Sequence, residues 1–193
     1  MKRFFSVRAP VPLLAALTLL LLWDATGFAK LSLLCAALHE CGHILAFCAL
    51  TGHFPRITCS FSGLAMEMDG VRLSLQKENL LLLAGPAANL LAALAAYLLI
   101  QHRASYLRYF FACENLCMAL FNLLPIGFLD GGRLLSNCFG LMDGVLFRAL
   151  TLCCCFFLAV FGGVLLRYCG AGFLLSLGFC LMVLALCAKS LRS

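Results

Sequence analysis

Long apolar runs, each close to the length of a membrane span, follow one another along most of this 193-residue chain. An apolar helix of about 20 residues crosses the hydrocarbon core of a bilayer. Six such helices are predicted, at Pro10–Phe28, Leu31–Leu50, Leu80–Ile100, Tyr106–Leu124, Val145–Leu166 and Gly170–Ala188. The short gaps between them favour antiparallel neighbours. The pattern therefore predicts an all-α polytopic membrane protein with about six transmembrane helices.

The longest interruption, residues 51–78, lies between the second and third predicted spans. Its apolar residues alternate with polar ones from Ile57 onward, which is typical of strands. The dipeptide Asp69-Gly70 is a frequent hairpin turn. We expect a small membrane-associated β-hairpin here, which is either a plain connector or an edge strand that pairs with an extended peptide.

Composition agrees with a membrane protein of little extramembrane mass. Hydrophobic residues make up 64% of the chain and the mean hydropathy is +1.06, which excludes an ordinary soluble domain. We expect residues 1–193 to form a single membrane-embedded domain. The first apolar run is long for a signal peptide and lacks a convincing cleavage site, so it is interpreted as a retained helix.

Charge predicts the orientation of the chain. With the N-terminus in the cytoplasm, the cytoplasmic side carries ten Lys and Arg and the far side four, which favours cytoplasmic N- and C-termini. No basic patch with interleaved aromatics suggests a nucleic-acid partner. The 13 cysteines lie mostly in apolar segments and form no C-x-x-C pair, so they are interpreted as small apolar residues of membrane helices.

Three polar residues stand together in the second predicted span, in the stretch "AALHECGHILAF". His39 and His43 are one helical turn apart, and Glu40 projects into the same sector. This is the H-E-x-x-H arrangement, in which two imidazoles bind Zn²⁺ and the carboxylate reaches the metal-bound water. An ionisable residue inside a membrane costs about 2.5–3.5 kcal/mol, so the placement favours function over packing.

A catalytic zinc site takes a third protein ligand. The candidates are His53, Asp69, Glu114 and Asp130. Asp130 has the best context, "FNLLPIGFLDGGRLL", because Pro125 and the nearby glycines disrupt the helix. Irregular backbone at membrane depth is tolerated where it lines protein or a wet cavity, and an aspartate there can turn towards the metal.

The segments "HECGH", "AGPAANLLAAL" and "NLLPIGFLDGG", in this order and spacing, resemble the site-2 protease family of M50-type intramembrane zinc metalloproteases. The core motifs cover residues 31–133. The chain is similar to the compact bacterial branch that includes the sporulation sigma-factor-processing protease. We expect no PDZ domain and no C-terminal regulatory domain, and therefore no selection of substrates by such domains.

The resemblance implies site residues, partners and a location. It implies His39, His43 and Asp130 as zinc ligands, Glu40 as catalytic base and Asn122 as a residue lining the active site. Asn89 and Pro86 look like supporting positions. The expected function is peptide-bond hydrolysis in membrane-associated substrates near the cytoplasmic side of a bacterial cytoplasmic membrane, with sporulation-type pro-sigma-factor processing as one such role. A regulatory membrane partner fits this role.

Two other functions compete with the protease. A zinc-binding transporter would favour polar residues along a path through several spans, whereas here they cluster in one place. A non-catalytic membrane scaffold would not need the complete H-E-x-x-H and Asp130 set. Chelator-sensitive peptide cleavage that depends on Glu40 would separate the protease from both.

Overall fold

The computed structural model describes residues 5–7, 10–60, 63–67, 72–127, 129–140, 149, 151–154 and 160. The chain divides into two compact units, Met1–Asn122 and Leu123–Ser193. The predicted sixth span and most of the fifth lie outside the described residues. The prediction of one domain for residues 1–193 stays a prediction.

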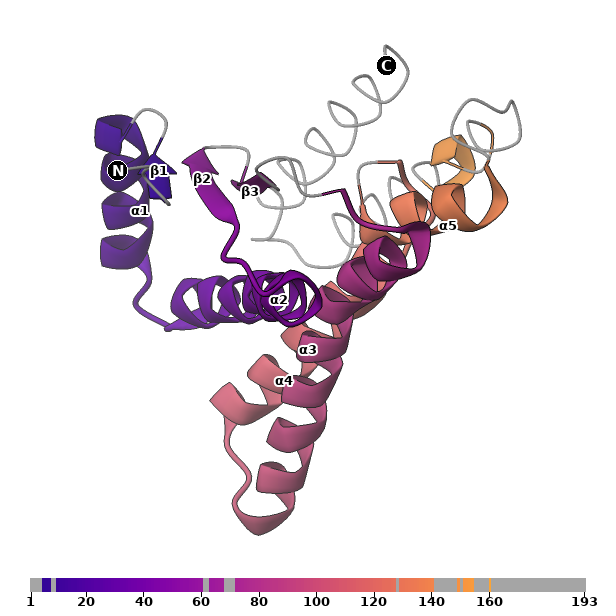
Figure 1. The fold of residues 1–193 in the computed structure, drawn as a ribbon. Coiled ribbons are helices and arrows are strands. Elements are labelled where there is room, and N and C mark those ends of the chain that lie inside the picture. Colours follow the sequence, from indigo (N-terminus) through magenta and orange to yellow (C-terminus); the bar gives the residue numbers. More distant parts are fainter. Residues whose placement is uncertain are drawn as a thin grey trace. The chain divides into compact units, whose positions relative to one another are not determined.

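The helices of the first unit are α1 (Pro10–Trp23), α2 (Phe28–Thr51), α3 (Leu75–His102) and α4 (Tyr106–Asn122), shown in Figure 1. They correspond to the first four predicted spans, with one correction. The first span was expected to run to Phe28, but α1 ends at Trp23 and α2 already begins at Phe28. The reason is Asp24, whose carboxylate accepts hydrogen bonds from the backbone N–H groups of Gly27 and Lys30 and so supports the start of α2.

Within the described residues, two helices are long and apolar enough to cross a membrane, α2 with 24 residues and α3 with 28. At 1.5 Å per residue, the 14 residues of α1 extend about 21 Å, short of a hydrocarbon core of about 30 Å. The helix α4, with 17 residues, also falls below the length of a full span. Six spans are therefore not confirmed, although the chain is mostly helical as predicted.

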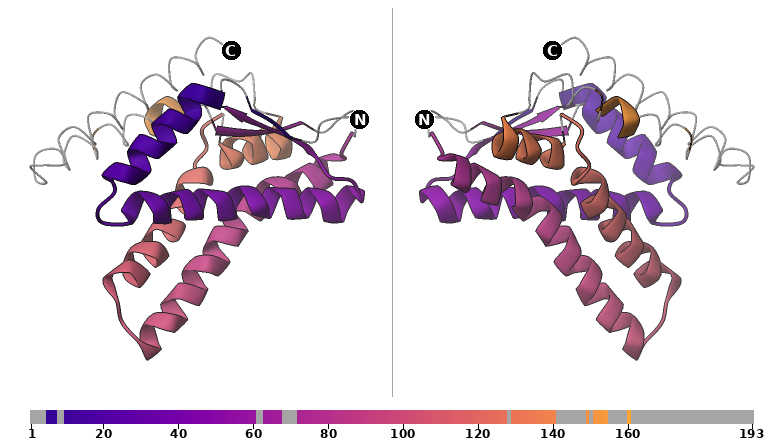
Figure 2. Two further views of the ribbon diagram at one scale, coloured as in Figure 1. Left: turned by 90° about the vertical axis from the view of Figure 1, so that its left-hand side faces the viewer. Right: turned by 90° about the vertical axis from the view of Figure 1, so that its right-hand side faces the viewer.

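The contact between α2 and α3 is made close by small residues. A Cβ built on Gly42 would lie 2.5 Å from the carbonyl oxygen of Ala84 and 2.9 Å from the Cβ of Ala88, so only glycine fits there. Glycine and proline in the "GPAAN" segment would favour a helix break, but Pro86 is buried inside α3 and the helix continues through it. Figures 1 and 2 show α3 and α4 running side by side, with their joined ends extending beyond α2.

A three-stranded sheet of order β1-β2-β3 accompanies these helices. Strands β2 (Arg56–Ser60) and β3 (Gly63–Glu67) pair antiparallel, with Arg56 opposite Glu67 and Ser60 opposite Gly63. Strand β1 (Phe5–Val7), which the sequence patterns did not predict, pairs parallel with β2. The strand at Ile57 and Cys59 is therefore central, with β1 and β3 as its neighbours, and the edge-strand role expected of the hairpin stays a prediction. Asp69-Gly70 lies outside the described residues, and membrane association of the sheet stays a prediction.

The described part of the second unit begins with an irregular segment and continues into α5 (Asp130–Phe139). The chain doubles back there through hydrogen bonds from the backbone N–H of Ile126 to the carbonyl of Leu124, and from the N–H of Leu129 to the carbonyl of Ile126. Ile126 and Leu129 are buried. The predicted break near Pro125 is thus present, because α4 ends at Asn122 and the helical hydrogen-bond ladder does not continue.

Candidate metal centre

Two imidazole rings meet on one side of α2. His39 is buried, with 6% of its surface exposed, and His43 is half-buried. Their ring centroids lie 4.8 Å apart at an interplanar angle of 84°, and their Nε2 atoms are 3.1 Å apart. The one-turn spacing in the sequence therefore places both nitrogens at one point in the first unit, as predicted.

The neighbouring helix α3 fixes the ring of His43. Its Nδ1 lies 2.8 Å from the carbonyl oxygen of Leu81, and a carbonyl oxygen can only accept. Nδ1 therefore carries the proton, and Nε2 keeps the lone pair that a metal ion needs. Gly85, one turn further along α3, lies directly against both rings, because a Cβ there would overlap His43 and come within 2.8 Å of Cε1 of His39.

The spacing of the two Nε2 atoms suits zinc. Two nitrogens bound at 2.0–2.1 Å in tetrahedral geometry are about 3.3 Å apart. The observed 3.1 Å is close to this value. The same contact is a hydrogen bond when Nε2 of His39 carries a proton. In either state the two rings converge, so the donor atoms need little rearrangement to share an ion.

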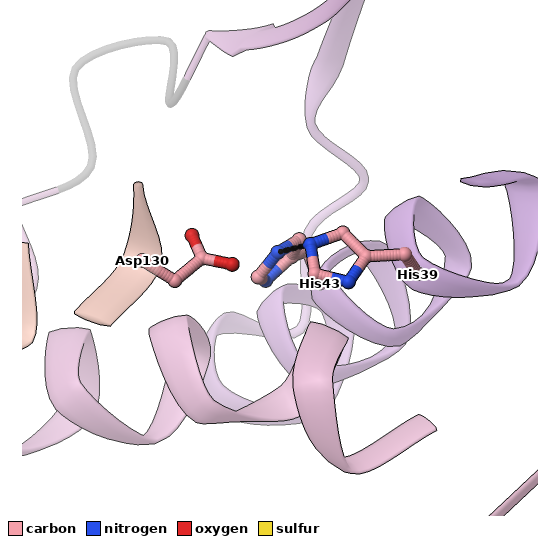
Figure 3. A group of neighbouring side chains, drawn as sticks. All are labelled: His39, His43 and Asp130. Carbon is pink, nitrogen blue, oxygen red and sulfur yellow. Dashed lines mark hydrogen bonds between the residues drawn. The ribbon is translucent and has the colours of Figure 1, made fainter. Parts of the chain in front are cut away.

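Asp130 begins α5, where a carboxylate is favoured by the helix dipole. One ligand atom from each of His39, His43 and Asp130 lies within 4.8 Å of the other two, so these side chains form a group that could hold a metal ion (Figure 3). Two nitrogens and one carboxylate oxygen are a ligand set used by catalytic zinc.

The other candidate ligands are absent from this group. His53 is exposed beyond the end of α2, where its Nδ1 lies 2.8 Å from the carbonyl oxygen of Thr51. Glu114 is half-buried on α4, and Asp69 lies outside the described residues. Of the described candidates, Asp130 is the one grouped with the histidines.

Glu40 and Asn122, the predicted catalytic residues, stay predictions. Glu40 is half-buried on α2, between the two histidines in sequence. Asn122 is the last residue of α4, and its side-chain amide donates to the carbonyl oxygen of Met118, 3.0 Å away. Asn89, a predicted supporting residue, is fully buried, and neither polar atom of its side chain has a hydrogen-bond partner among the described residues.

Two contributions were missed from the sequence. The Leu81 carbonyl belongs to the backbone, so no side-chain pattern identifies it. The contact of Gly85 with the rings had a partial signal, because the small residues Ala84, Gly85, Ala87 and Ala88 predict a close helix contact. Ala84, Gly85 and Ala88 take part in that contact, whereas Ala87 is exposed.

Comparison with known proteins gives a match to a protein family and a similar solved structure. Residues 99–161, which include Asp130, match the model of Peptidase family M50. The structure is similar to the site-2 protease from Methanocaldococcus jannaschii, with a TM-score of 0.57 and 20% sequence identity over 93% of this chain and 84% of that one. No curated protein matches. The family match and the structural match agree with the family that the sequence motifs predict.

Proposed function

We propose that this chain, a member of the site-2 protease family, is an intramembrane zinc metalloprotease that cleaves membrane-associated protein substrates. The observation that carries the proposal is the group of His39, His43 and Asp130, of which the two histidines flank Glu40 in an H-E-x-x-H sequence. The M50 match and the two helices long enough to span a membrane support it.

His39, His43 and Asp130 would hold Zn²⁺ through two imidazole nitrogens and one carboxylate oxygen. Bound zinc supplies a Lewis acid that polarises the scissile carbonyl and lowers the pKa of water. The Leu81 carbonyl keeps His43 in the tautomer with a free Nε2. Because Gly85 has no side chain, the rings of His39 and His43 can pack directly against the backbone of α3.

Glu40 would act as the general base. It takes a proton from the attacking water, whose oxygen forms the new bond to the scissile carbonyl carbon, and then gives that proton to the leaving amine nitrogen as the C–N bond breaks. Asn122 would donate a hydrogen bond to the oxyanion or to the substrate backbone. Its present bond to Met118 is within its own helix, so a rotation of the side chain would free the donor.

A transmembrane substrate must unwind before cleavage, because a helix hides its amide carbonyls in hydrogen bonds. The extended segment would add to the sheet. Since β2 already pairs with β1 and β3, the addition would take place at the outer edge of β3 or β1.

The proposed setting is a bacterial cytoplasmic membrane with both termini in the cytoplasm. The cut would lie near the cytoplasmic side and the product would be released there. Pro-sigma factors of the sporulation type are the proposed substrate class, and a regulatory membrane partner is part of the proposal. The basic residues that favour this orientation are concentrated in the segments expected on that side.

The test compares the unmodified chain with Glu40→Gln, each expressed in a bacterial membrane. New protein N-termini in membrane-anchored proteins should appear with the wild type and disappear with a zinc chelator. The variant should cleave about 10²–10⁴-fold more slowly than the wild type, while one zinc ion per chain stays bound.

Glu78→Gln, which makes the same change in the first turn of α3, is the matched control and should cleave normally. Normal cleavage by Glu40→Gln would rule out the catalytic assignment. Bound zinc without cleavage in the wild type would favour the scaffold or the transporter.

A further inference from the structure

The far halves of α3 and α4 enclose an apolar groove that the proposed protease does not use. Its volume is about 490 Å³, and its lining includes Ala93, Leu94 and Tyr97 of α3, and Tyr109, Ala112 and Leu116 of α4. Tyr97 and Tyr109 are each more than half exposed. The groove lies wholly within the first unit, on the part of the helix pair that extends beyond α2 in Figures 1 and 2.

A basic turn joins the two helices at the end of this groove. His102 and Arg103 are exposed, and Arg108 follows in the first turn of α4. Residues 101–113 contain no Asp or Glu. In the predicted orientation this turn is on the side where Lys and Arg are usually rare, so topology does not account for the cluster.

Arg108 is held in place beside the turn. Its Nη1 donates to the carbonyl oxygens of Leu99, at 3.2 Å, and of Arg103. These bonds fix the guanidinium at the C-terminus of α3, and they use one of its three nitrogens. A guanidinium has five N–H donors and binds phosphate through a planar pair of them.

The groove lies at the depth of the lipid acyl chains, and the turn lies at the depth of the lipid headgroups. Residues 80–100 of α3 contain no charged residue, and their 21 residues correspond to about 30 Å, the thickness of the hydrocarbon core. The basic turn that follows is therefore at the level of the lipid headgroups. Tyr97 and Tyr109 lie where aromatic side chains collect in membrane proteins, close to the interface.

We propose that the α3–α4 groove and the basic turn form a binding site for one anionic phospholipid. An acyl chain fills the groove, and the phosphate binds Arg103, Arg108 and His102. Basic sites between membrane helices bind acidic headgroups in this way. A helix is about 10 Å wide, and a 15 Å length of it occupies roughly 1,200 Å³, so the groove suits a flexible chain better than a partner helix.

The experiment measures contact between lipid and the groove by the quenching of tryptophan fluorescence in vesicles. The chain has a single tryptophan, so Trp23→Phe with Tyr97→Trp places the only indole in the groove. The probes are dioleoyl phosphatidylglycerol and phosphatidylcholine with brominated acyl chains, which quench an indole that they contact. Quenching should favour phosphatidylglycerol about fivefold or more, since each arginine contributes about that factor.

Leu98→Trp in the same Trp23→Phe chain is the matched control. Leu98 is 55% exposed on α3 and does not line the groove, so it should report equal quenching by the two lipids. Adding Arg103→Gln to Tyr97→Trp should lower the preference about fivefold, and Lys30→Gln, on a different turn, should leave it unchanged. Arg103 is chosen first because Arg108 also supports the end of α3. Soluble glycerol 3-phosphate should not displace the quenching lipid.

Three results would overturn the proposal. Equal preference at Tyr97→Trp and Leu98→Trp would mean ordinary contact with bulk lipid. Quenching at Leu98→Trp without quenching at Tyr97→Trp would mean that a protein segment fills the groove. A preference that survives both Arg103→Gln and Arg108→Gln would mean that the basic turn does not bind the headgroup.

Discussion

The two histidines and Asp130 depend on different kinds of backbone. His39 and His43 stand on a regular 24-residue helix, and the neighbouring helix α3 supplies their surroundings. Asp130 follows an irregular segment of the second unit, where a Cβ on Gly131 would overlap the backbone of Leu123 and one on Gly132 the backbone of Ile126. The two histidines need only the regular spacing of one helical turn. The placement of Asp130 requires close backbone contacts at Gly131 and Gly132, so this segment should tolerate far fewer substitutions.

Gly131→Ala should have the largest effect. The obstructing atoms are backbone, which cannot move aside as a side chain can, so the segment before α5 must be displaced and Asp130 with it. We expect a loss of about 3 kcal/mol of unfolding free energy and at least a 100-fold loss of zinc affinity. Thermal unfolding and a zinc titration measure the two. A variant with wild-type zinc affinity would show that the segment adapts to the added methyl group.

Asp130→Asn should come second, because it removes the charge of the proposed third ligand and keeps its shape. Zinc affinity should fall by at least the 10–100-fold that loss of a supporting partner typically costs, and activity should fall with it. The unfolding midpoint without metal should fall only slightly, because the dipole of α5 favours a negative charge at its first residue. Stoichiometric zinc binding at unchanged affinity would mean that another residue is the third ligand.

Gly85→Ala should have a smaller effect on zinc than Asp130→Asn. The added Cβ overlaps imidazole rings, and side chains can turn away. We expect a fall in zinc affinity of about tenfold and a cost of about 1–3 kcal/mol in unfolding free energy. Ala87→Val, on the exposed side of the same helix, is the control and should change neither. If Gly85→Ala lost more zinc affinity than Asp130→Asn, the histidine part of the candidate site would be the more sensitive one.

Asp24→Asn should have the smallest effect and none on zinc. Desolvation raises the pKa of Asp24, but hydrogen bonds from the backbone of Lys30, the Thr26 hydroxyl and the backbone of Gly27 outweigh it and hold the pKa below its usual 3.8. A lowered carboxyl pKa stabilises the fold above the ordinary value, and that stability is lost as the pH falls through the lowered pKa. The variant should therefore melt slightly below the wild type at pH 7, and the difference should vanish once the pH falls below the lowered pKa of Asp24. A constant difference at all pH values would point to packing instead of charge.

The sequence predicted the histidine half of the site better than the aspartate half. His39, Glu40 and His43 follow from helical periodicity, since α2 extends without interruption through all three. The helix break before Asp130 could be predicted from Pro125 and its glycines. The path of the chain after the break could not, because it depends on hydrogen bonds such as that from Leu129 to Ile126. Strand β1 was missed for a similar reason, since its three residues carry no pattern and its pairing with β2 spans about 50 residues of sequence.

The hydrogen-bond partner of His43 on α3 is a backbone carbonyl, and this determines which substitutions position 81 tolerates. Every amino acid at position 81 carries the same carbonyl, so the identity of Leu81 does not determine the hydrogen bond that sets the tautomer. A saturation mutagenesis scan should find position 81 tolerant of other apolar residues, although it contributes an atom to the proposed active site. Related sequences could differ freely there and share the same proton position on the ring. Position 85, whose backbone contributes only by the absence of a side chain, should favour glycine, with alanine as the least damaging replacement.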